Sequence, residues 1–150
     1  SWRLVFIVPD FELRKAVARA ALPTQLDFAT SVTAAARGEA LVVGLQRGAA
    51  AVLESALDDV LHVPFSRNLI PGYDRVTDAA RTAGAIGATL SGSGSTIVAV
   101  VKRGRESAVQ DAAVAAWRTV DVNATAFATA PETHGAASDP ASTQHGSQPG

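Results

Sequence analysis

The sequence contains no cysteine and no methionine in 150 residues. Without thiols the chain can form no disulfide and can offer no thiolate to a metal ion. Aromatic residues make up only 5%, so the core has to be built from Leu, Val, Ile, five Phe and two Trp. The length suits one domain of ordinary size.

Strong charge of either sign is also lacking, because 13 basic and 14 acidic side chains leave a formal net charge of −1. We therefore expect no nucleic-acid partner and no attraction to an anionic membrane. Apolar runs such as residues 97–101 are far shorter than the roughly 18 residues of a membrane-spanning helix. The chain opens with a strand-like run at residues 4–8 and shows no signal-peptide pattern, which predicts a cytoplasmic location.

Apolar periodicity divides the chain into short strands and amphipathic helices. Runs of β-branched and apolar residues predict strands at residues 4–8, 86–90, 96–101 and 120–127. Apolar residues at helical spacing predict helices at residues 13–22, 27–45, 49–61, 73–83 and 106–118. The stretch at residues 62–72 contains two prolines and is expected to be irregular.

This order of elements is the split βαβ order of ferredoxin-like domains, with extra helices inserted in the first crossover. We therefore expect an α+β fold over residues 1–130. The first strand opens the chain, and a buried strand needs partners on both edges, so we expect an upstream portion or a second chain beside it. Residues 131–150 contain no Val, Ile, Leu, Phe, Tyr or Trp, which predicts a disordered tail that includes His134 and His145.

The most informative stretch is rich in glycine and lies between two predicted strands. It contains Ser91, Gly92, Ser93, Gly94 and Ser95. Small residues allow backbone amides to approach an anion closely, so a phosphate can bind there. The stretch is neither a P-loop nor a dinucleotide fingerprint, since a strand follows it where those motifs need a helix. A plain glycine-rich hairpin is the alternative interpretation.

A polar cluster occupies the segment between two predicted helices. It contains Asp58, Asp59, His62, Ser66 and Arg67, and prolines fix the backbone around it. Such a segment is a plausible substrate surface. The alternative is that both aspartates lie on a solvated helix face and that His62 satisfies carbonyl groups at the end of the helix.

A third candidate is Arg19, whose guanidinium can present a fork to a carboxylate or a phosphate. The alternative is an exposed helical arginine, and Arg37 and Arg47 are interpreted in that way. No Ser, His and Asp set has the logic of a catalytic triad. The three histidines lack metal-ligand spacing, so we expect no metal site on this chain.

In this order and at this spacing, the clusters resemble the C-terminal half of the homoserine kinases, within the GHMP small-molecule kinase superfamily. The matching segments are residues 8–11, 18–23, 59–65, 69–72 and 84–94. The likeness runs from about Val5 to Thr129, which implies a GHMP-kinase C-terminal-like domain at residues 1–130.

The resemblance implies ATP-dependent phosphorylation of the side-chain hydroxyl of L-homoserine, a step toward threonine. It implies a cytoplasmic enzyme that uses Mg-ATP and is often a homodimer. Arg19 matches a family arginine that binds the amino-acid carboxylate, and His62 is expected among the substrate-binding residues. The loop from Ser91 to Ser95 would face the phosphoryl-transfer region, where positioning and charge stabilisation do most of the work.

Two of the positions that depart from the family pattern lie in the predicted site. The family usually has an arginine two residues after the proline that matches Pro64, whereas this chain has Ser66 followed by Arg67. Either Arg67 takes the role after a shift of one residue, or Ser66 stands in a clamp that is half missing. The family's Gly-Ser-Gly-Pro ends here in Ser95, which removes a rigid φ angle and should loosen the loop.

The N-terminal half of the family, with its phosphate loop and most adenine contacts, has no counterpart in this sequence. We therefore expect the missing half to bind most of the ATP and Mg²⁺, and the isolated chain to be inactive. Two alternatives remain open. One is another GHMP kinase acting on mevalonate-type or sugar substrates, and the other is a non-catalytic module that binds a small amino acid.

Overall fold

The computed structural model describes residues 2–132 and residue 135. Its four strands form one antiparallel sheet in the order β2-β3-β1-β4. The strands are β1 (Trp2–Pro9), β2 (Ala85–Leu90), β3 (Ile97–Lys102) and β4 (Ala124–Thr129). This is the ferredoxin-like order, so the expected α+β class is confirmed.

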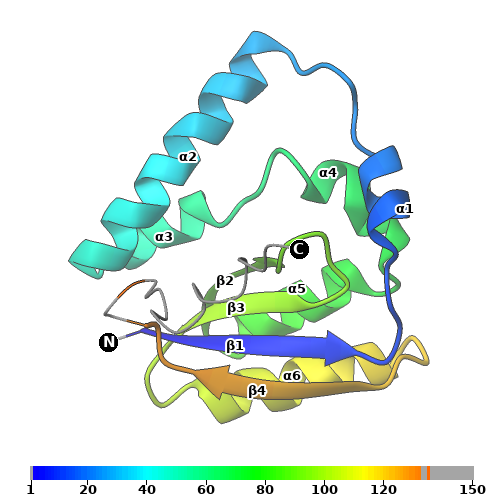
Figure 1. Ribbon diagram of the computed structural model, residues 1–150. Coiled ribbons are helices and arrows are strands. Elements are labelled where there is room, and N and C mark those ends of the chain that lie inside the picture. The colour runs from blue at the N-terminus through cyan, green and yellow to red at the C-terminus, as the bar shows by residue number, and fades with distance from the viewer. Residues whose placement is uncertain (1, 133–134, 136–150) are drawn as a thin grey trace, which may run out of the picture.

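Most of the helices lie in the crossover between β1 and β2. They are α1 (Lys15–Ala20), α2 (Phe28–Arg47), α3 (Ala50–Ala56), α4 (Val63–Ser66), the 3-10 helix η1 (Arg67–Leu69) and α5 (Tyr73–Thr82). A further helix, α6 (Glu106–Arg118), connects β3 to β4. Figure 1 shows α5 and α6 on one face of the sheet and α2 and α3 on the other, with α1 and α4 beside each other at the far end.

The main core lies between the sheet and the pair α5 and α6. Val5 and Ile7 of β1 and Trp117 of α6 are all fully buried there. Burial of an indole of roughly 150–250 Å² contributes about 4–6 kcal/mol of hydrophobic free energy before entropy is counted. The indole N–H also donates to the carbonyl oxygen of Pro71 at 2.9 Å, which connects α6 to the turn before α5.

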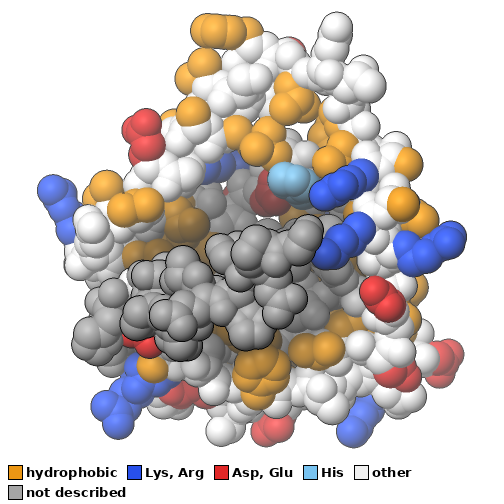
Figure 2. Space-filling view, in the orientation of Figure 1, with side chains coloured by type: hydrophobic (Ala, Val, Ile, Leu, Met, Phe, Trp, Pro, Cys, Tyr) orange, Lys and Arg blue, Asp and Glu red, His pale blue; other side chains and the backbone are white. Residues whose placement is uncertain are grey.

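A smaller cluster packs α3 on the opposite face of the sheet. Leu53 and Leu57 are buried there against Val100 of β3. The helix α2 packs on α3, but its outer face is apolar and exposed: Phe28 is 84% exposed and Val42 55% exposed. Apolar side chains along this outer face are visible in Figure 2. Thus α2 lies over the sheet and packs mainly on α3.

Two element boundaries were predicted wrongly. The last strand begins at Ala124 where Val120 was expected, because Asp121 has a φ of 59° and buried Val122 donates its N–H to Trp117 in a turn. The helix expected to reach Leu61 ends at Ala56. Asp58 and Asp59 therefore lie in a loop and not on a helix face. The segment 62–72, expected to be irregular, contains α4 and η1.

The first strand finds both of its partners within the chain. β1 pairs with β3 on one side and with β4 on the other. The edge-pairing reason for expecting an upstream portion or a second chain is therefore wrong, because both edges of β1 are paired. Most of the tail expected at residues 131–150 lies outside the described residues. None of the described helices combines the length and the apolar character needed to cross a membrane.

Gly44→Ala should destabilise the protein, because α2 and α3 approach closely at this residue. A Cβ there would lie 2.9 Å from Leu53 Cγ and 3.2 Å from the Leu53 backbone nitrogen. Overpacking costs about 1–3 kcal/mol, which exceeds the roughly 0.5–1 kcal/mol that alanine gains over glycine in a helix. The free energy of unfolding in urea, followed by circular dichroism, measures the effect.

Gly38→Ala is the matched control on the same helix, since nothing lies within 4 Å of a Cβ at Gly38. It should raise the free energy of unfolding by about 0.5–1 kcal/mol. Equal stability of the two variants would show that α2 and α3 do not pack as closely as described.

Candidate functional site

A cavity of about 160 Å³ brings together three segments that are far apart in the sequence. Arg19 comes from the last turn of α1, His62 and Ser66 from the two ends of α4, and Gly92 and Ser93 from the loop between β2 and β3. Its wall is completed by Ala18, Leu22 and Leu90. We call it the α1–α4 pocket. Sites for drug-sized ligands measure roughly 300–1,000 Å³, so this pocket suits a small metabolite.

The side chains of Arg19 and Ser66 in the α1–α4 pocket are available to a ligand. Within the described part of the chain, no carboxylate forms an ion pair with Arg19. Ser66 is only 3% exposed, and no described residue forms a hydrogen bond with its hydroxyl. The pocket therefore offers a guanidinium, a hydroxyl and an imidazole, a set that suits a small molecule carrying a carboxylate.

The loop between β2 and β3 contributes its tip to the pocket. Gly92 and Gly94 have φ angles of 63° and 85°, which favour glycine. A Cβ at Gly92 would meet nothing within 4 Å, so the backbone there is open to an approaching group. Between residues 2 and 132, the N–H groups of Gly92 and Ser93 donate to no backbone carbonyl. The tip thus presents two backbone donors and the Ser93 hydroxyl.

The base of the same loop is anchored. Ser95 is 8% exposed, and its hydroxyl donates to the carbonyl oxygen of Phe11 at 2.8 Å. The Ser91 N–H donates to the Thr96 carbonyl oxygen at 2.9 Å, closing the hairpin. The loosening expected from serine in place of proline is therefore opposed by a buried hydrogen bond.

Arg67 lies outside the α1–α4 pocket. Its Nη2 is 2.8 Å from Asp74 Oδ2, and it lines a separate polar cavity of about 400 Å³. The structure thus places Ser66, and not Arg67, beside Arg19 and His62.

Tyr73 also lines this polar cavity. Burial raises the pKa of its phenol, and the nearby Thr89 hydroxyl lowers that pKa by a smaller amount.

A larger and mostly apolar cavity of about 240 Å³ lies under α2, and we call it the α2–α3 pocket. It shares His62 and Leu90 with the α1–α4 pocket, so the two cavities adjoin. Figure 2 shows this side of the molecule hollowed beneath α2, with acidic, histidine and basic side chains around the hollow.

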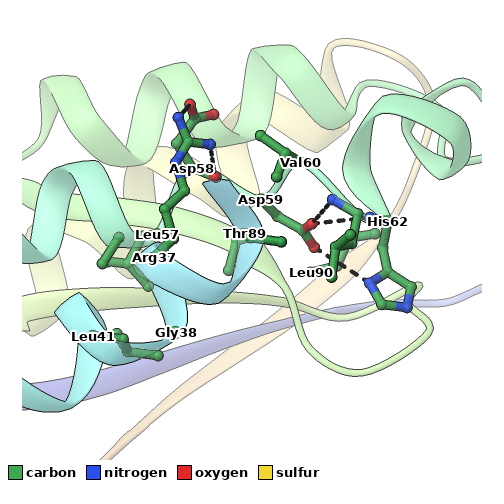
Figure 3. A pocket seen from close by; sticks show the side chains of 13 residues that line it. Arg37, Gly38, Leu41, Leu57, Asp58, Asp59, Val60, His62, Thr89 and Leu90 are labelled. Atoms are coloured by element: carbon green, nitrogen blue, oxygen red, sulfur yellow. Dashed lines mark hydrogen bonds and ion pairs between the residues drawn. The ribbon is translucent and has the colours of Figure 1, made fainter. Parts of the chain in front are cut away.

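Arg37 closes the rim of the α2–α3 pocket and is not simply solvated. Its Nη2 is 2.9 Å from Asp58 Oδ2, and its Nη1 donates to the Asp58 carbonyl oxygen (Figure 3). The pair connects α2 to the segment that follows α3. Arg47 is exposed, as expected.

Asp59 holds the start of α4. Its Oδ1 accepts the N–H groups of Leu61 at 2.6 Å and His62 at 2.9 Å. Its Oδ2 lies 3.7 Å from His62 Nδ1, and Figure 3 shows the carboxylate between this backbone and the imidazole. Sequence reasoning missed this role because it placed Asp59 on a helix face. An aspartate that accepts the N–H two residues further on forms an Asx turn, and an Asp shortly before Pro64 is a turn signal that could have found it.

The chemistry that these residues can support is therefore ligand binding and charge stabilisation. In the stretch from residue 2 to 132, no group of three or more His, Cys, Asp or Glu side chains is arranged to hold a metal ion. The loop tip fits one wall of a phosphate site and not a complete cradle.

Comparison with known proteins points to one family. The family model described as GHMP kinases C terminal matches residues 41–119. The homoserine kinase of Trichormus variabilis is 42% identical over 132 residues, covering 88% of this chain and 44% of that protein. The homoserine kinase of a Picosynechococcus species is 41% identical over 122 residues, covering 81% of this chain and 40% of that protein. The chain thus spans less than half the length of these relatives.

Solved structures agree with this picture. The crystal structure of homoserine kinase from Cytophaga hutchinsonii superposes with a TM-score of 0.82 at 26% identity, covering 86% of this chain and 41% of that one. A structure of a putative homoserine kinase from Listeria monocytogenes gives a TM-score of 0.54 at 20% identity and shares the fold. The family match covers more than half of the chain and includes α4, α5, the glycine loop and α6. The chain belongs to the family of GHMP kinase C-terminal domains.

Proposed function

We propose that this chain is the C-terminal part of a homoserine kinase and that the α1–α4 pocket binds L-homoserine. One observation carries the proposal: Arg19, His62, Ser66 and the loop tip, predicted from separate segments, meet in one cavity of metabolite size. The identity of about 40% to homoserine kinases supports the choice of substrate. We expect a GHMP kinase for mevalonate-type or sugar substrates to share the glycine loop but not the clusters at residues 64–71 and around Arg19.

In this proposal the chain's own residues bind and orient the acceptor. Arg19 pairs with the carboxylate of L-homoserine, since a guanidinium forms two parallel hydrogen bonds with a carboxylate. Ser66 and His62 contact the polar part of the amino acid from α4. The N–H groups of Gly92 and Ser93 face the transferred phosphoryl group and stabilise its charge. Alignment of the acceptor hydroxyl with that group accounts for much of the rate enhancement.

Mg-ATP supplies the phosphoryl group when it is bound. We expect it to be held mainly by the N-terminal part that the longer relatives possess, because the loop tip here provides only one wall. Threonine biosynthesis and a cytoplasmic location follow from the same proposal and are predictions.

Phosphoryl transfer from ATP to L-homoserine tests the proposal directly. The chain alone should show no turnover, and the chain supplied with the N-terminal half of a homoserine kinase should form O-phospho-L-homoserine. Turnover by the chain alone would contradict its assignment as half of a site. Binding of L-homoserine without turnover in either mixture would favour the non-catalytic amino-acid-binding module.

Arg19→Ala should weaken the binding of L-homoserine by about 1.5–3 kcal/mol, or roughly 10- to 150-fold in the dissociation constant, because a charged hydrogen bond is lost. Isothermal titration calorimetry on the reconstituted enzyme measures this. Arg67→Ala is the matched control, since Arg67 pairs with Asp74 outside the pocket. If Arg67→Ala weakens the binding of L-homoserine as much as Arg19→Ala does, Arg67 would also have to bind the carboxylate.

Asp59→Asn should change the tautomer populations of the His62 imidazole while leaving the turn before α4 intact. Asparagine can still accept the N–H groups of Leu61 and His62, but it no longer offers a carboxylate to Nδ1. We expect a smaller population of the Nδ1–H tautomer in ¹⁵N NMR and binding of L-homoserine that is weaker by about 0.2–1 kcal/mol, as for a partly exposed pair. An unchanged tautomer population would limit the role of Asp59 to its two backbone hydrogen bonds in the turn before α4. Asp59→Ala should in addition destabilise the fold by about 0.5–1.5 kcal/mol for each of the two hydrogen bonds lost from the turn before α4.

A further inference from the structure

The outer edge of β4 is open in this structure. β4 pairs with β1 along one side, and the order β2-β3-β1-β4 leaves no strand on its other side among residues 2–132. Edge strands expose unpaired backbone groups that can pair with another chain, and proteins commonly block them with charge, proline or a bulge. β4 has none of these protections: its sequence is Ala-Thr-Ala-Phe-Ala-Thr, and its register with β1 is regular.

The opposite edge of the sheet is protected. The register of β2 with β3 shifts between Ala85 and Gly87, which is a bulge-like irregularity. Arg81 Nη2 donates to the carbonyl oxygen of Ala88 at 3.4 Å and so occupies a backbone acceptor of β2. Among residues 2–132, the contrast between the two edges indicates that β4 is the edge left free to pair.

The direction of the free backbone groups follows from the β1–β4 ladder. The Asp10 N–H donates to the Asn123 carbonyl oxygen at 2.8 Å, so the residues at this end of the ladder form a hydrogen-bonded pair. Alternation along an antiparallel ladder then directs the backbone groups of Thr125, Phe127 and Thr129 toward β1. The backbone groups of Ala126 and Ala128 point outward, away from the sheet.

The sequence of this edge is a palindrome. Thr-Ala-Phe-Ala-Thr at residues 125–129 reads the same in both directions, with Phe127 at its centre. In an antiparallel pair centred on Phe127, Ala126 of one copy would face Ala128 of the other, and these are the residues with outward backbone groups. Each Thr125 would face a Thr129, and the two Phe127 side chains would face each other at a non-hydrogen-bonded position, where side chains approach most closely.

The side chain of Phe127 is exposed and held in place by a neighbouring ring, as such a contact requires. It is 54% exposed although it is a large apolar side chain in a strand. Its ring stacks on Phe6, with centroids 5.3 Å apart and an interplanar angle of 19°. Pairing of two copies would extend this stack to a row of four phenylalanine rings and cover the exposed face.

We propose that two copies of this chain associate through β4, antiparallel and centred on Phe127, to form one continuous sheet. A two-fold axis through Phe127 makes the contact self-complementary and closed. The family resemblance implies that homodimers are common but names no surface, and this inference rests on the β4 edge and not on the proposed function.

Sedimentation equilibrium of the 150-residue chain tests the association, and a charge exchange tests the register. Thr125 and Thr129 are both exposed, so charges there leave the core unchanged. Thr125→Lys with Thr129→Lys places lysine opposite lysine twice and should give a monomer. Thr125→Glu with Thr129→Lys places opposite charges in the same pairs and should restore the dimer. Ser107→Lys with Ala115→Lys adds the same charge on exposed positions of α6 and should remain dimeric.

Hydrogen exchange supplies a second measurement. The amide protons of Ala126 and Ala128 should exchange slowly in the dimer and rapidly in the double-lysine variant. A monomeric wild-type chain would overturn the proposal, and a dimer that appears only after removal of residues 133–150 would assign the edge to that segment instead. A dimer that survives the double-lysine change, or that the Glu and Lys pair fails to restore, would also overturn the proposed pairing.

Discussion

The geometry of the candidate site depends on one partly buried hydrogen bond, from the Ser95 hydroxyl to the Phe11 carbonyl oxygen. The two residues are 84 positions apart in the sequence. Phe11 lies where the chain leaves β1 toward α1, and Ser95 lies at the base of the glycine loop. The bond therefore joins the segment that leads into α1 and Arg19 to the base of the loop whose tip carries Ser93. The Trp117 bond to Pro71 acts similarly on the other face of the sheet, where it holds the turn before α5.

Much of the fold could be predicted from the sequence because the strands and helices show their periods directly. The errors fall where a turn ends an element before its apolar pattern does. The alternation of residues 120–127 suggested a strand, but Val122 is buried in a turn beside Trp117, and Asp121 takes a left-handed conformation. Likewise, the apolar positions of α3 continue past Ala56, while the hydrogen bonds of Asp59 start a new segment instead.

For the site, too, residues in short sequence clusters could be predicted, whereas contacts between separate elements could not. Arg19, His62, Ser66 and the glycine loop stand out because they belong to short, recognisable clusters, and the structure brings them together in one cavity. The choice between Ser66 and Arg67 could not be made from the sequence, since it depends on which way a single helical turn faces. The Arg37 contact with Asp58 was also hidden, because it joins residues of two elements that only the fold brings together.

His62 belongs to the walls of both the α1–α4 pocket and the α2–α3 pocket. A ligand that turns this imidazole in one cavity necessarily changes the shape of the other. Occupancy of the two cavities is then linked, and thermodynamic reciprocity requires that each ligand alter the affinity for the other by the same factor. The two adjoining cavities therefore share one wall, to which the His62 side chain belongs.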